Sequence, residues 1–473
     1  MQPLDIAIVV IFLLGNILLG LLQGRSNKNN NDYFLGGHRL PWFIAMLSIV
    51  ATETSVLTFV SVPGLAYRGD WTFLQLPLGY IFGRILVSFI LLPAYFENGV
   101  SSIYEIIGIR FGKGMQKLAS VVFLLTRILG DGVRFLATGV VVQVVTGWPL
   151  STAVAIIGIV TLIYTISGGL KTVVWLDSIQ FGLYLLGGLA TIVFILLQLE
   201  GDPVSIISSL ADTGKLTMID TGGNVLFNPM VFGSAFVGGV FLSFASHGID
   251  YMMVQRVLGC SDLSAARKAM IGSGLFVFFQ FMIFLFAGSL IYLFMHGMAT
   301  DKDREFATFI VRYLPSGLKG LLLAGILSAA MSTIASSINS LAASTVTDLL
   351  GGKVSLFMSK VISAGWAVVL ITIALMFDES DKAIIMVGLE IASFTYGGLL
   401  GLFLLSKTRR NFRPQSLAFG LIAGMGIVFV LKLYGIAWTW YIIISVAANI
   451  IMAFSLDSLL DLLKRENNTG NKA

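Results

Sequence analysis

Long uninterrupted runs of apolar residues alternate with short polar segments along almost the whole chain. A bilayer core about 30 Å thick needs roughly 20 apolar residues per helix, and each run has about this length. Backbone groups in lipid must bond within their own segment, which favours helices. The pattern therefore predicts an all-α polytopic membrane protein with about 13 transmembrane helices. The predicted spans are 4–23, 41–66, 71–98, 115–146, 151–168, 172–199, 229–257, 269–296, 319–346, 358–377, 382–406, 414–435 and 438–463.

The composition excludes several other classes of protein. Charged residues make up 12% of the 473 residues, against about 25% in an average soluble protein, and apolar residues make up 56%. A soluble fold cannot bury that much apolar surface, and disorder requires the opposite balance. The net charge of +5 lies in short loops between spans, so no nucleic-acid partner is expected. The single cysteine, Cys260, excludes an internal disulfide, and the three histidines form no metal-binding pattern.

The distribution of Lys and Arg predicts the orientation in the bilayer. If the N-terminus lies outside and the loops alternate, most basic residues fall into inner loops, among them Arg25, Arg39, Lys171 and Arg256. We therefore expect a multi-pass protein of the cell membrane (inner or plasma), with the lipid bilayer as a partner and a cytoplasmic C-terminus. The basic residues that fall inside spans are Arg84, Arg127, Arg134 and Lys432.

The second span carries polar residues at mid-membrane depth. The segment Ala51–Thr58 contains four hydroxyl side chains and one carboxylate, and Pro63 follows it. Hydroxyl side chains compete for backbone hydrogen bonds, and a proline cannot donate to the preceding turn. Two interpretations remain open, namely an unwound segment that interrupts the helix and a continuous helix kinked by proline.

The ninth span contains a row of serines at intervals of four, with Thr333 and Ser337 beside it. The row consists of Ser328, Ser332, Ser336, Ser340 and Ser344. Residues four apart share one helix face, so the row is expected to face protein or an aqueous path. Hydroxyl oxygens suit a hard cation such as sodium, although a small-residue seam for helix packing has the same spacing.

Charged residues inside other spans are candidates for function. Asp177, near the inner end of the sixth span, is either functional or a solvated helix-start residue. In the fourth span Arg127, Asp131 and Arg134 share one helix face, and Asp131 neutralises one arginine. The other arginine requires Glu53, Glu390 or the solute as its partner. The group is therefore either a structural charge cluster or a site for a carboxylate.

Several segments, in their order and spacing, resemble the sodium/solute symporter family, which includes the sodium–glucose, sodium–proline and sodium–sialic acid transporters. They are Asp32–Pro41, Ala51–Tyr67, Ser167–Leu170 followed by Asp177 and Gln180, Val254–Arg256, Gly317–Gly320 and Ser328–Ser340. The resemblance implies the leucine-transporter-type fold, in which two inverted five-helix repeats each begin with a helix broken near the membrane midplane.

The same resemblance implies the division of the chain. Residues 1–40 form an extra N-terminal helix and a cytoplasmic loop, 41–199 the first inverted repeat, and 200–228 an extracellular loop. Residues 229–406 form the second inverted repeat, and 407–473 form two C-terminal helices and a cytoplasmic tail. The broken helices are the second and seventh spans, around Ala51–Thr58 and Ser243–Gly248.

The resemblance also implies where the coupling ion binds. The main sodium site uses the backbone carbonyls of Ala51, Thr54 and Ala329 and the hydroxyls of Ser332 and Thr333. A possible second sodium site uses Asp177, Ser332 and Ser336. Other members carry a serine where this chain has Ala335, so one sodium ion is favoured over two. Sodium is the only metal expected, as a coupling ion, and no other cofactor is expected.

The solute is expected beside the main sodium ion, between the broken helices. The predicted lining residues are Ser55, Thr58, Phe73, Gln75, Arg127, Arg134, Ser243 and Glu390. These groups fit a small polar solute, either a sugar or a carboxylate-like molecule.

The predicted function is a secondary-active sodium-coupled symporter that imports this solute by alternating access. Two alternatives remain open: a proton-coupled transporter that uses Glu53 or Asp131, and a solute sensor that does not transport. An enzyme is not expected and no catalytic residue is predicted, because the chain has no HExxH pattern and Gly130-Asp131 lacks the earlier glycine of a GxGD protease.

Overall fold

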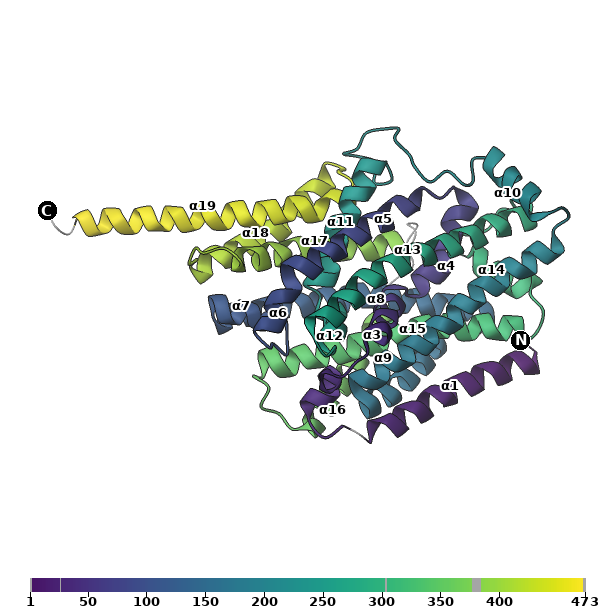
Figure 1. The fold of residues 1–473 in the computed structure, drawn as a ribbon, viewed down its shortest axis with the longest axis horizontal. Helices are drawn as coiled ribbons and strands as arrows, with labels where there is room; N and C mark the ends of the chain where they lie inside the picture. Colours follow the sequence, from purple (N-terminus) through teal and green to yellow (C-terminus); the bar gives the residue numbers. More distant parts are fainter. Residues whose placement is uncertain (1, 26, 303, 377–383, 471–473) are drawn as a thin grey trace.

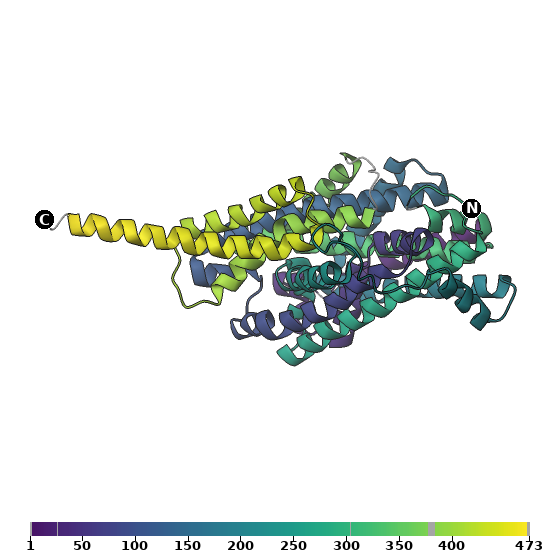
Figure 2. The same ribbon diagram turned by 90° about the horizontal axis from the view of Figure 1, so that it is seen from above.

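The protein forms an elongated bundle of helices. The computed structural model describes residues 2–25, 27–302, 304–376 and 384–470, except the side chains of residues 57, 133, 137, 145, 384–393 and 465–470. Within these ranges the regular structure is helical, apart from a bridge between Leu40 and Cys260. Most helices run along the long axis (Figure 1), and the two termini lie at its opposite ends, also in the perpendicular view (Figure 2). This layout suits a bundle that crosses a membrane along that axis.

The helices follow one another in the order below. Before residue 200 they are α1 (Pro3–Gly24), α2 (Asn30–Leu35), η1 (Gly36–His38), α3 (Trp42–Glu53), α4 (Val56–Arg68), η2 (Thr72–Leu74), α5 (Gln75–Leu86), η3 (Val87–Leu91), α6 (Leu92–Glu97), α7 (Tyr104–Phe111), α8 (Lys113–Thr146) and α9 (Leu150–Gln198). After it they are α10 (Pro203–Asp212), α11 (Phe232–Gly248), α12 (Tyr251–Leu258), α13 (Leu263–Phe294), α14 (Glu305–Tyr313), α15 (Leu318–Ser344), η4 (Thr345–Leu349), α16 (Leu356–Met376), α17 (Ile384–Ser406), α18 (Pro414–Leu433), η5 (Trp438–Trp440) and α19 (Tyr441–Gly470).

The predicted spans coincide with these helices. Among the described residues, eight helices are long and apolar enough to cross a membrane, or ten if two bent pairs each count as one span. The helix α9 contains two predicted spans, because Gly169 (φ +64°, ψ −165°) interrupts its helical conformation. A Cβ atom at this position would lie 2.6 Å from the carbonyl oxygen of Tyr33, so glycine is required. The predicted span 382–406 begins outside the described residues and continues as α17.

Two of the spans are broken, as the sequence predicts. The helices α3 and α4 meet at 60°, and α11 and α12 meet at 61°. The first break lies at Thr54 and Ser55, whereas Pro63 lies inside α4. Of the two interpretations of this span, the one with an unwound segment is therefore confirmed. The second break lies at Ile249 and Asp250, just after the polar stretch of α11. Asp250 ends the break because its side chain accepts the Met252 N–H (3.0 Å) and so caps α12.

The helix α15 lies at the centre of the bundle and α1 at its edge. In the apolar window of α15, 94% of residues are buried, against 22% in α1 and in α16. Every serine of the predicted row is buried in protein. Small side chains let neighbouring helices approach a central helix closely. The row therefore faces other helices, and its hydroxyls are available to them.

Candidate ion and solute sites

The break between α3 and α4 frees main-chain oxygen atoms deep in the bundle. The Ser55 N–H donates to the Glu53 carbonyl (3.0 Å), whereas in a regular helix it would donate to Ala51. The Thr58 N–H likewise donates to the Ser55 carbonyl (2.9 Å) instead of that of Thr54. The carbonyl groups of Ala51 and Thr54, two of the predicted sodium ligands, are thereby released from helical hydrogen bonding.

The helix α15 presents hydroxyl groups to this break. Thr333 Oγ1 lies 3.3 Å from the Thr52 carbonyl oxygen and 3.2 Å from that of Ala329. Ser332 is 1% exposed, and its hydroxyl makes no hydrogen bond of normal geometry within the described ranges, although Asp177 is close enough for a weak one. A buried hydroxyl without a partner is costly unless a ligand satisfies it.

Uncharged main-chain and hydroxyl oxygens therefore meet where α3 ends against α15. Such oxygens are the ligands that a hard cation prefers. The structure brings together the two elements to which the main sodium site is assigned, and the individual ligands remain a prediction.

Asp177 of α9 does not lie in solvent at a helix start. Asp177 is 1% exposed, and its Oδ2 accepts from Ser48 Oγ (2.5 Å) and from Arg256 Nη2 (3.2 Å). The Arg256 guanidinium also donates to Ser48 Oγ (2.8 Å), Thr52 Oγ1 (2.6 Å) and Ser336 Oγ. A fixed cation therefore lies among the oxygens of Asp177 and Ser336, which the resemblance assigns to a second sodium ion.

The expectation that Arg256 lies in an inner loop is wrong. Arg256 is fully buried in α12, and the neighbouring Gln255 is buried as well and donates to the Phe34 carbonyl (2.7 Å). Counting by the positive-inside rule places this basic residue, at the end of an apolar run, in a loop. In the structure the Asp177 carboxylate of α9 stabilises its charge within the helix bundle. The segment Val254–Arg256 did carry a signal, because it is one of the family-like motifs.

Charged residues of α8 form a second polar cluster, beside the other helix break. Arg127 Nη2 lies 3.3 Å from Asp131 Oδ1, and Arg127 Nη1 lies 3.3 Å from Asp250 Oδ2. Asp250 also accepts from the Tyr396 hydroxyl, and Asp131 accepts from the hydroxyl of Ser337. Arg127 is thus enclosed between two carboxylates, one of which sequence analysis did not consider.

Arg134 is less completely satisfied than Arg127. It lies 3.7 Å from Asp131, and its side chain is 16% exposed. In the described part of the chain, its Nε and Nη1 atoms have no hydrogen-bond partner. Ser337, which bonds to Asp131, lies one helical turn beyond Thr333 on α15. Apart from its ion pair with Asp131, Arg134 therefore has donors that no described residue satisfies, and Asp131 links it to the level of the candidate sodium site.

Glu53, the last residue of α3, is held by two other groups. It forms an ion pair with Arg84 of α5, and its Oε2 lies 3.6 Å from His247 Nε2. Arg84 donates in addition to Ser273 Oγ (2.6 Å). Both acidic residues of the proton-coupled alternative, Glu53 and Asp131, are thus engaged in ion pairs.

The other predicted solute residues have different surroundings. Ser55 and Thr58 are buried at the first break, where they remain candidates. Gln75 instead donates to the carbonyls of Thr72 (2.9 Å) and Met230 (2.6 Å) and accepts the Asp220 N–H (3.1 Å), so it fastens the loop 200–228.

Phe73 and Ser243 also make contacts that hold the bundle together. The Phe73 ring packs edge-on against that of Phe281, with the centroids 5.3 Å apart. Ser243 Oγ donates to the Tyr80 carbonyl (3.0 Å), which joins α11 to α5. The side chain of Glu390 lies outside the described residues.

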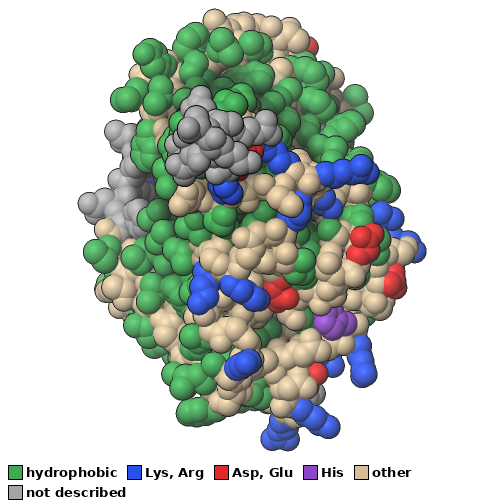
Figure 3. Space-filling view, turned by 90° about the vertical axis from the view of Figure 1, so that its left-hand side faces the viewer, with side chains coloured by type: hydrophobic (Ala, Val, Ile, Leu, Met, Phe, Trp, Pro, Cys, Tyr) green, Lys and Arg blue, Asp and Glu red, His purple; other side chains and the backbone are tan. Residues whose placement is uncertain are grey.

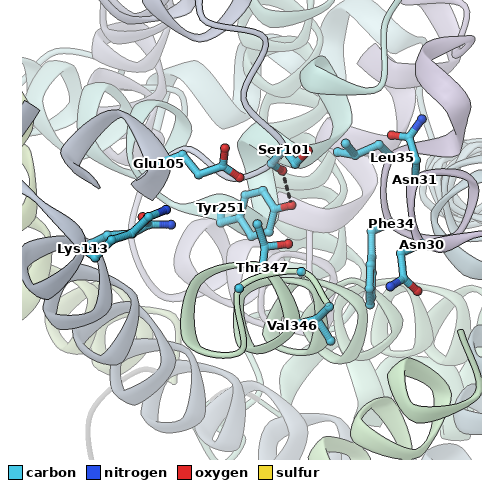
Figure 4. A pocket seen from close by; sticks show the side chains of 13 residues that line it. Asn30, Asn31, Phe34, Leu35, Ser101, Glu105, Lys113, Tyr251, Val346 and Thr347 are labelled. Atoms are coloured by element: carbon cyan, nitrogen blue, oxygen red, sulfur yellow. Dashed lines mark hydrogen bonds between the residues drawn. The ribbon is translucent and has the colours of Figure 1, made fainter. Parts of the chain in front are cut away.

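The serine row leads from the ion site to a polar cavity. Ser344 Oγ and Ser102 Oγ donate to Asp348 Oδ2 (2.9 and 2.8 Å), and Gln116 Nε2 donates to Oδ1 (2.8 Å). A cavity of about 320 Å³ adjoins this cluster, between α2, α8, α12 and η4. Tyr251 lies in its wall and donates to the Ser101 carbonyl (2.6 Å; Figure 4).

Comparison with known proteins identifies the family. The sequence profile of the sodium:solute symporter family matches residues 33–408. The chain belongs to this family. Among curated relatives, human sodium-coupled monocarboxylate transporter 1 is 26% identical over 420 residues, which cover 85% of this chain and 68% of that protein. The human sodium/iodide cotransporter is 25% identical over 454 residues (91% and 69%), and the rabbit sodium-dependent multivitamin transporter is 27% identical over 452 (90% and 69%).

Solved structures of symporters share the fold. A sodium-coupled sialic acid symporter in a substrate-bound, outward-open state superposes with a TM-score of 0.88 at 23% identity, over 97% of this chain and 98% of that one. Mhp1, a nucleobase–cation symporter, superposes with a TM-score of 0.61 at 13% identity, over 90% and 94%. The predicted leucine-transporter-type fold is confirmed by these similarities together with the two broken helices.

Family membership decides between the functional alternatives. This sodium:solute symporter is a multi-pass membrane transporter that couples a small solute to sodium, and it is not an enzyme. The predicted function is thereby confirmed over the proton-coupled transporter and the sensor.

Proposed function

We propose that this symporter carries one sodium ion and one small organic anion, such as a monocarboxylate, into the cell in each cycle. The observation that carries the proposal is Arg134, whose Nε and Nη1 atoms have no hydrogen-bond partner among the described residues. It lies 3.7 Å from Asp131, which accepts from Ser337, one helical turn beyond Thr333. The guanidinium plane matches a carboxylate with two parallel hydrogen bonds. Two of the relatives are named for anions, monocarboxylates and iodide.

The sodium ion binds between the first helix break and α15. Its proposed ligands are the carbonyls of Ala51, Thr54 and Ala329 and the hydroxyls of Ser332 and Thr333. The released carbonyls support this assignment, as does the Ser332 hydroxyl, which makes no hydrogen bond of normal geometry among the described residues. A sodium ion there joins α3 to α15. The sodium ion and the solute then each stabilise the geometry that the other requires, so their coupling is reciprocal.

One ion per cycle follows from the position of Arg256. Its guanidinium supplies the positive charge that Asp177 requires and donates a hydrogen bond to the Ser336 hydroxyl oxygen. A second sodium ion would have to displace a buried ion pair, which costs about 3–5 kcal/mol. We therefore assign Asp177, Ser336 and Arg256 to a structural link between α9, α15 and α12.

The solute lies between the two broken helices, next to the sodium ion. Ser55 and Thr58 line it from the first break, and Arg134 holds its carboxylate from α8. Arg127 orients the second break through Asp250 and does not contact the solute. Residues 41–199 and 229–406 are the two inverted repeats that rock about this site, and the segments 1–40, 200–228 and 407–473 are additions to them.

We assign the orientation from the charge at one end of the bundle. Figure 3 shows the end at which α1 terminates, and Lys and Arg side chains outnumber Asp and Glu there. Exposed basic residues of this end include Arg25, Lys28, Arg39 and Lys171. We assign this end to the cytoplasm and the N-terminus to the outside of the cell membrane, as the positive-inside rule requires. The cavity beside Asp348 then opens on the cytoplasmic side, where solute and ion are released.

Uptake by proteoliposomes tests the proposal. With a tenfold inward sodium gradient, a monocarboxylate is expected to accumulate about tenfold, since a 1:1 stoichiometry transfers the same free energy to the solute. The accumulation should not respond to an imposed membrane potential, because one sodium ion and one anion together carry no net charge. Two sodium ions per anion would give about a hundredfold accumulation that responds to potential. Uptake that persists when potassium replaces sodium contradicts the proposal as a whole.

Arg134→Gln tests the anion site. We expect it to raise the half-saturating carboxylate concentration about 10-fold or more, because an ionic hydrogen bond contributes roughly 1.5–3 kcal/mol. The half-saturating sodium concentration should stay within twofold of wild type. Arg134→Lys keeps the charge but loses the planar, two-donor geometry of the guanidinium. Its half-saturating carboxylate concentration should lie between those of the wild type and Arg134→Gln. An unchanged carboxylate affinity in Arg134→Gln removes this residue from the solute site.

A further inference from the structure

A polar cavity of about 360 Å³ lies outside the transport site, where the chain passes from α1 to α3. Its wall includes Asn27, Asp32, Arg39, Lys171 and Trp175. The first three belong to the segment between α1 and α3, and the other two belong to the part of α9 that follows the Gly169 break. Its volume lies within the range of small-molecule sites, roughly 300–1,000 Å³.

Hydrogen bonds to other helices hold the walls of this cavity in place. Asn27 Nδ2 donates to the Gly168 carbonyl at the α9 break (2.8 Å). The Leu40 N–H donates to the Gly259 carbonyl (2.9 Å), and His38 Nδ1 lies 2.7 Å from the Leu258 carbonyl oxygen. The segment is therefore anchored on both sides, so the cavity is a built feature of the fold.

The cavity wall carries two positive charges, those of Arg39 and Lys171, and one negative charge, that of Asp32. Arg39 and Lys171 are exposed, and neither forms an ion pair with any described residue. Asp32, the one acidic residue of the wall, already accepts the backbone N–H of Lys28 (3.1 Å). The site therefore carries a net positive charge and offers a guanidinium, an ammonium group and amide donors to an anion.

Exposed apolar side chains lie close to the cavity in the chain. Ile179, one turn after Trp175 on the same face of α9, is 56% exposed. The last turns of α1 expose Leu21 (49%) and Leu22 (52%) as well. These apolar surfaces belong in the bilayer, and a tryptophan beside the cavity suits the membrane–water interface. The exposed basic side chains of this end of the molecule (Figure 3) belong in the headgroup region.

We infer that this cavity binds the phosphate headgroup of an anionic phospholipid, with Arg39 and Lys171 as its ligands. A phosphate is inferred because the wall carries two cations and one carboxylate, which leaves a net positive charge. A lipid is inferred as its source because apolar surface adjoins the cavity. A bound headgroup links the segment before the first broken helix to the second part of α9. This inference is independent of the proposed solute and stoichiometry.

Lipid binding by the purified full chain in nanodiscs tests the inference. Discs of phosphatidylcholine receive increasing fractions of phosphatidylglycerol, and the protein-bound lipid is counted by native mass spectrometry. Arg39→Gln/Lys171→Gln is expected to weaken phosphatidylglycerol binding about 25-fold, the product of a roughly fivefold contribution from each basic side chain. The matched control Lys268→Gln/Lys353→Gln removes the same charge from exposed positions at the same end and should stay within twofold of wild type.

Two further experiments complete the test. A competition with inorganic phosphate distinguishes the two sources of phosphate, and additional variants keep the test decisive if the first double variant does not fold. Inorganic phosphate at millimolar concentration should not displace the bound lipid; displacement with equal affinity would show a soluble-anion site and overturn the inference. Arg39→Lys/Lys171→Arg keeps both charges and should retain binding within a few-fold. If Arg39→Gln/Lys171→Gln does not fold, Lys171→Gln alone should weaken binding about fivefold. Equal binding by the charge-removing variant and its matched control refutes the site.

Discussion

Replacing Ser332 or Thr333 with alanine is expected to raise the sodium concentration for half-maximal uptake about 10- to 100-fold. Each change removes a hydroxyl oxygen from the proposed shell, and a bond to a charged group contributes roughly 1.5–3 kcal/mol. The released carbonyls of Ala51 and Thr54 remain, so a weakened site and not an absent one is expected. Sodium titrations of solute uptake measure the effect, together with sodium-dependent thermal unfolding of the purified protein.

Two matched variants give this prediction its control. Ser328 lies one turn before Ser332 in the same row, and its hydroxyl donates to the Ala324 carbonyl of its own helix (2.7 Å). Ser328→Ala should therefore leave the sodium dependence unchanged, whereas Thr333→Ser keeps the hydroxyl and should preserve most of the affinity. If Ser332→Ala and Thr333→Ala both bind sodium like the wild type, the ion lies elsewhere.

Arg256→Gln is expected to destabilise the protein by about 3–5 kcal/mol, because it leaves the Asp177 carboxylate buried without a counter-charge. Asp177→Asn should cost a similar amount, since it leaves the guanidinium unpaired. The double variant Asp177→Asn/Arg256→Gln removes both charges and should recover most of the loss. Thermal unfolding of the three variants in detergent, in the absence of sodium, measures this coupling.

An exposed ion pair serves as the comparison for the buried one. Asp461 lies 2.7 Å from Arg413, and its side chain is 52% exposed. Asp461→Asn should change the stability by about 0–1 kcal/mol, because water already solvates both charges. If the double variant Asp177→Asn/Arg256→Gln loses as much stability as the two single variants together, the two side chains do not stabilise each other. That result would contradict the structural link assigned here.

The two helix breaks differ in how well local sequence predicts them. At the first break, the hydroxyl and carboxylate side chains of Ala51–Thr58 occupy the segment that unwinds, so the signal and the feature coincide. At the second, the polar stretch is helical, and the break follows it at Ile249 and Asp250. An aspartate that caps the following helix is a readable signal, and it marks the boundary better than the polarity of the stretch before it.

The predicted solute residues show where a family resemblance stops being sufficient. Gln75 and Ser243 have the polarity of solute ligands, yet their hydrogen bonds go elsewhere. Gln75 bonds to Asp220 of the loop 200–228 and to Met230, and Ser243 bonds across the contact between α5 and α11. A position in a motif indicates the neighbourhood of a side chain, but its partner depends on which backbone groups pack beside it.

The sequence by itself determined the membrane class, the spans, the serine row and the resemblance to sodium symporters, because hydropathy and helical spacing are properties of neighbouring residues. Only the tertiary structure decided which charges neutralise one another. Arg256 meets Asp177 and Arg127 meets Asp250 from helices far apart in the chain. In an interior of low dielectric constant, the energy of a charge depends on the few ångströms to its partner, and no local pattern encodes that distance.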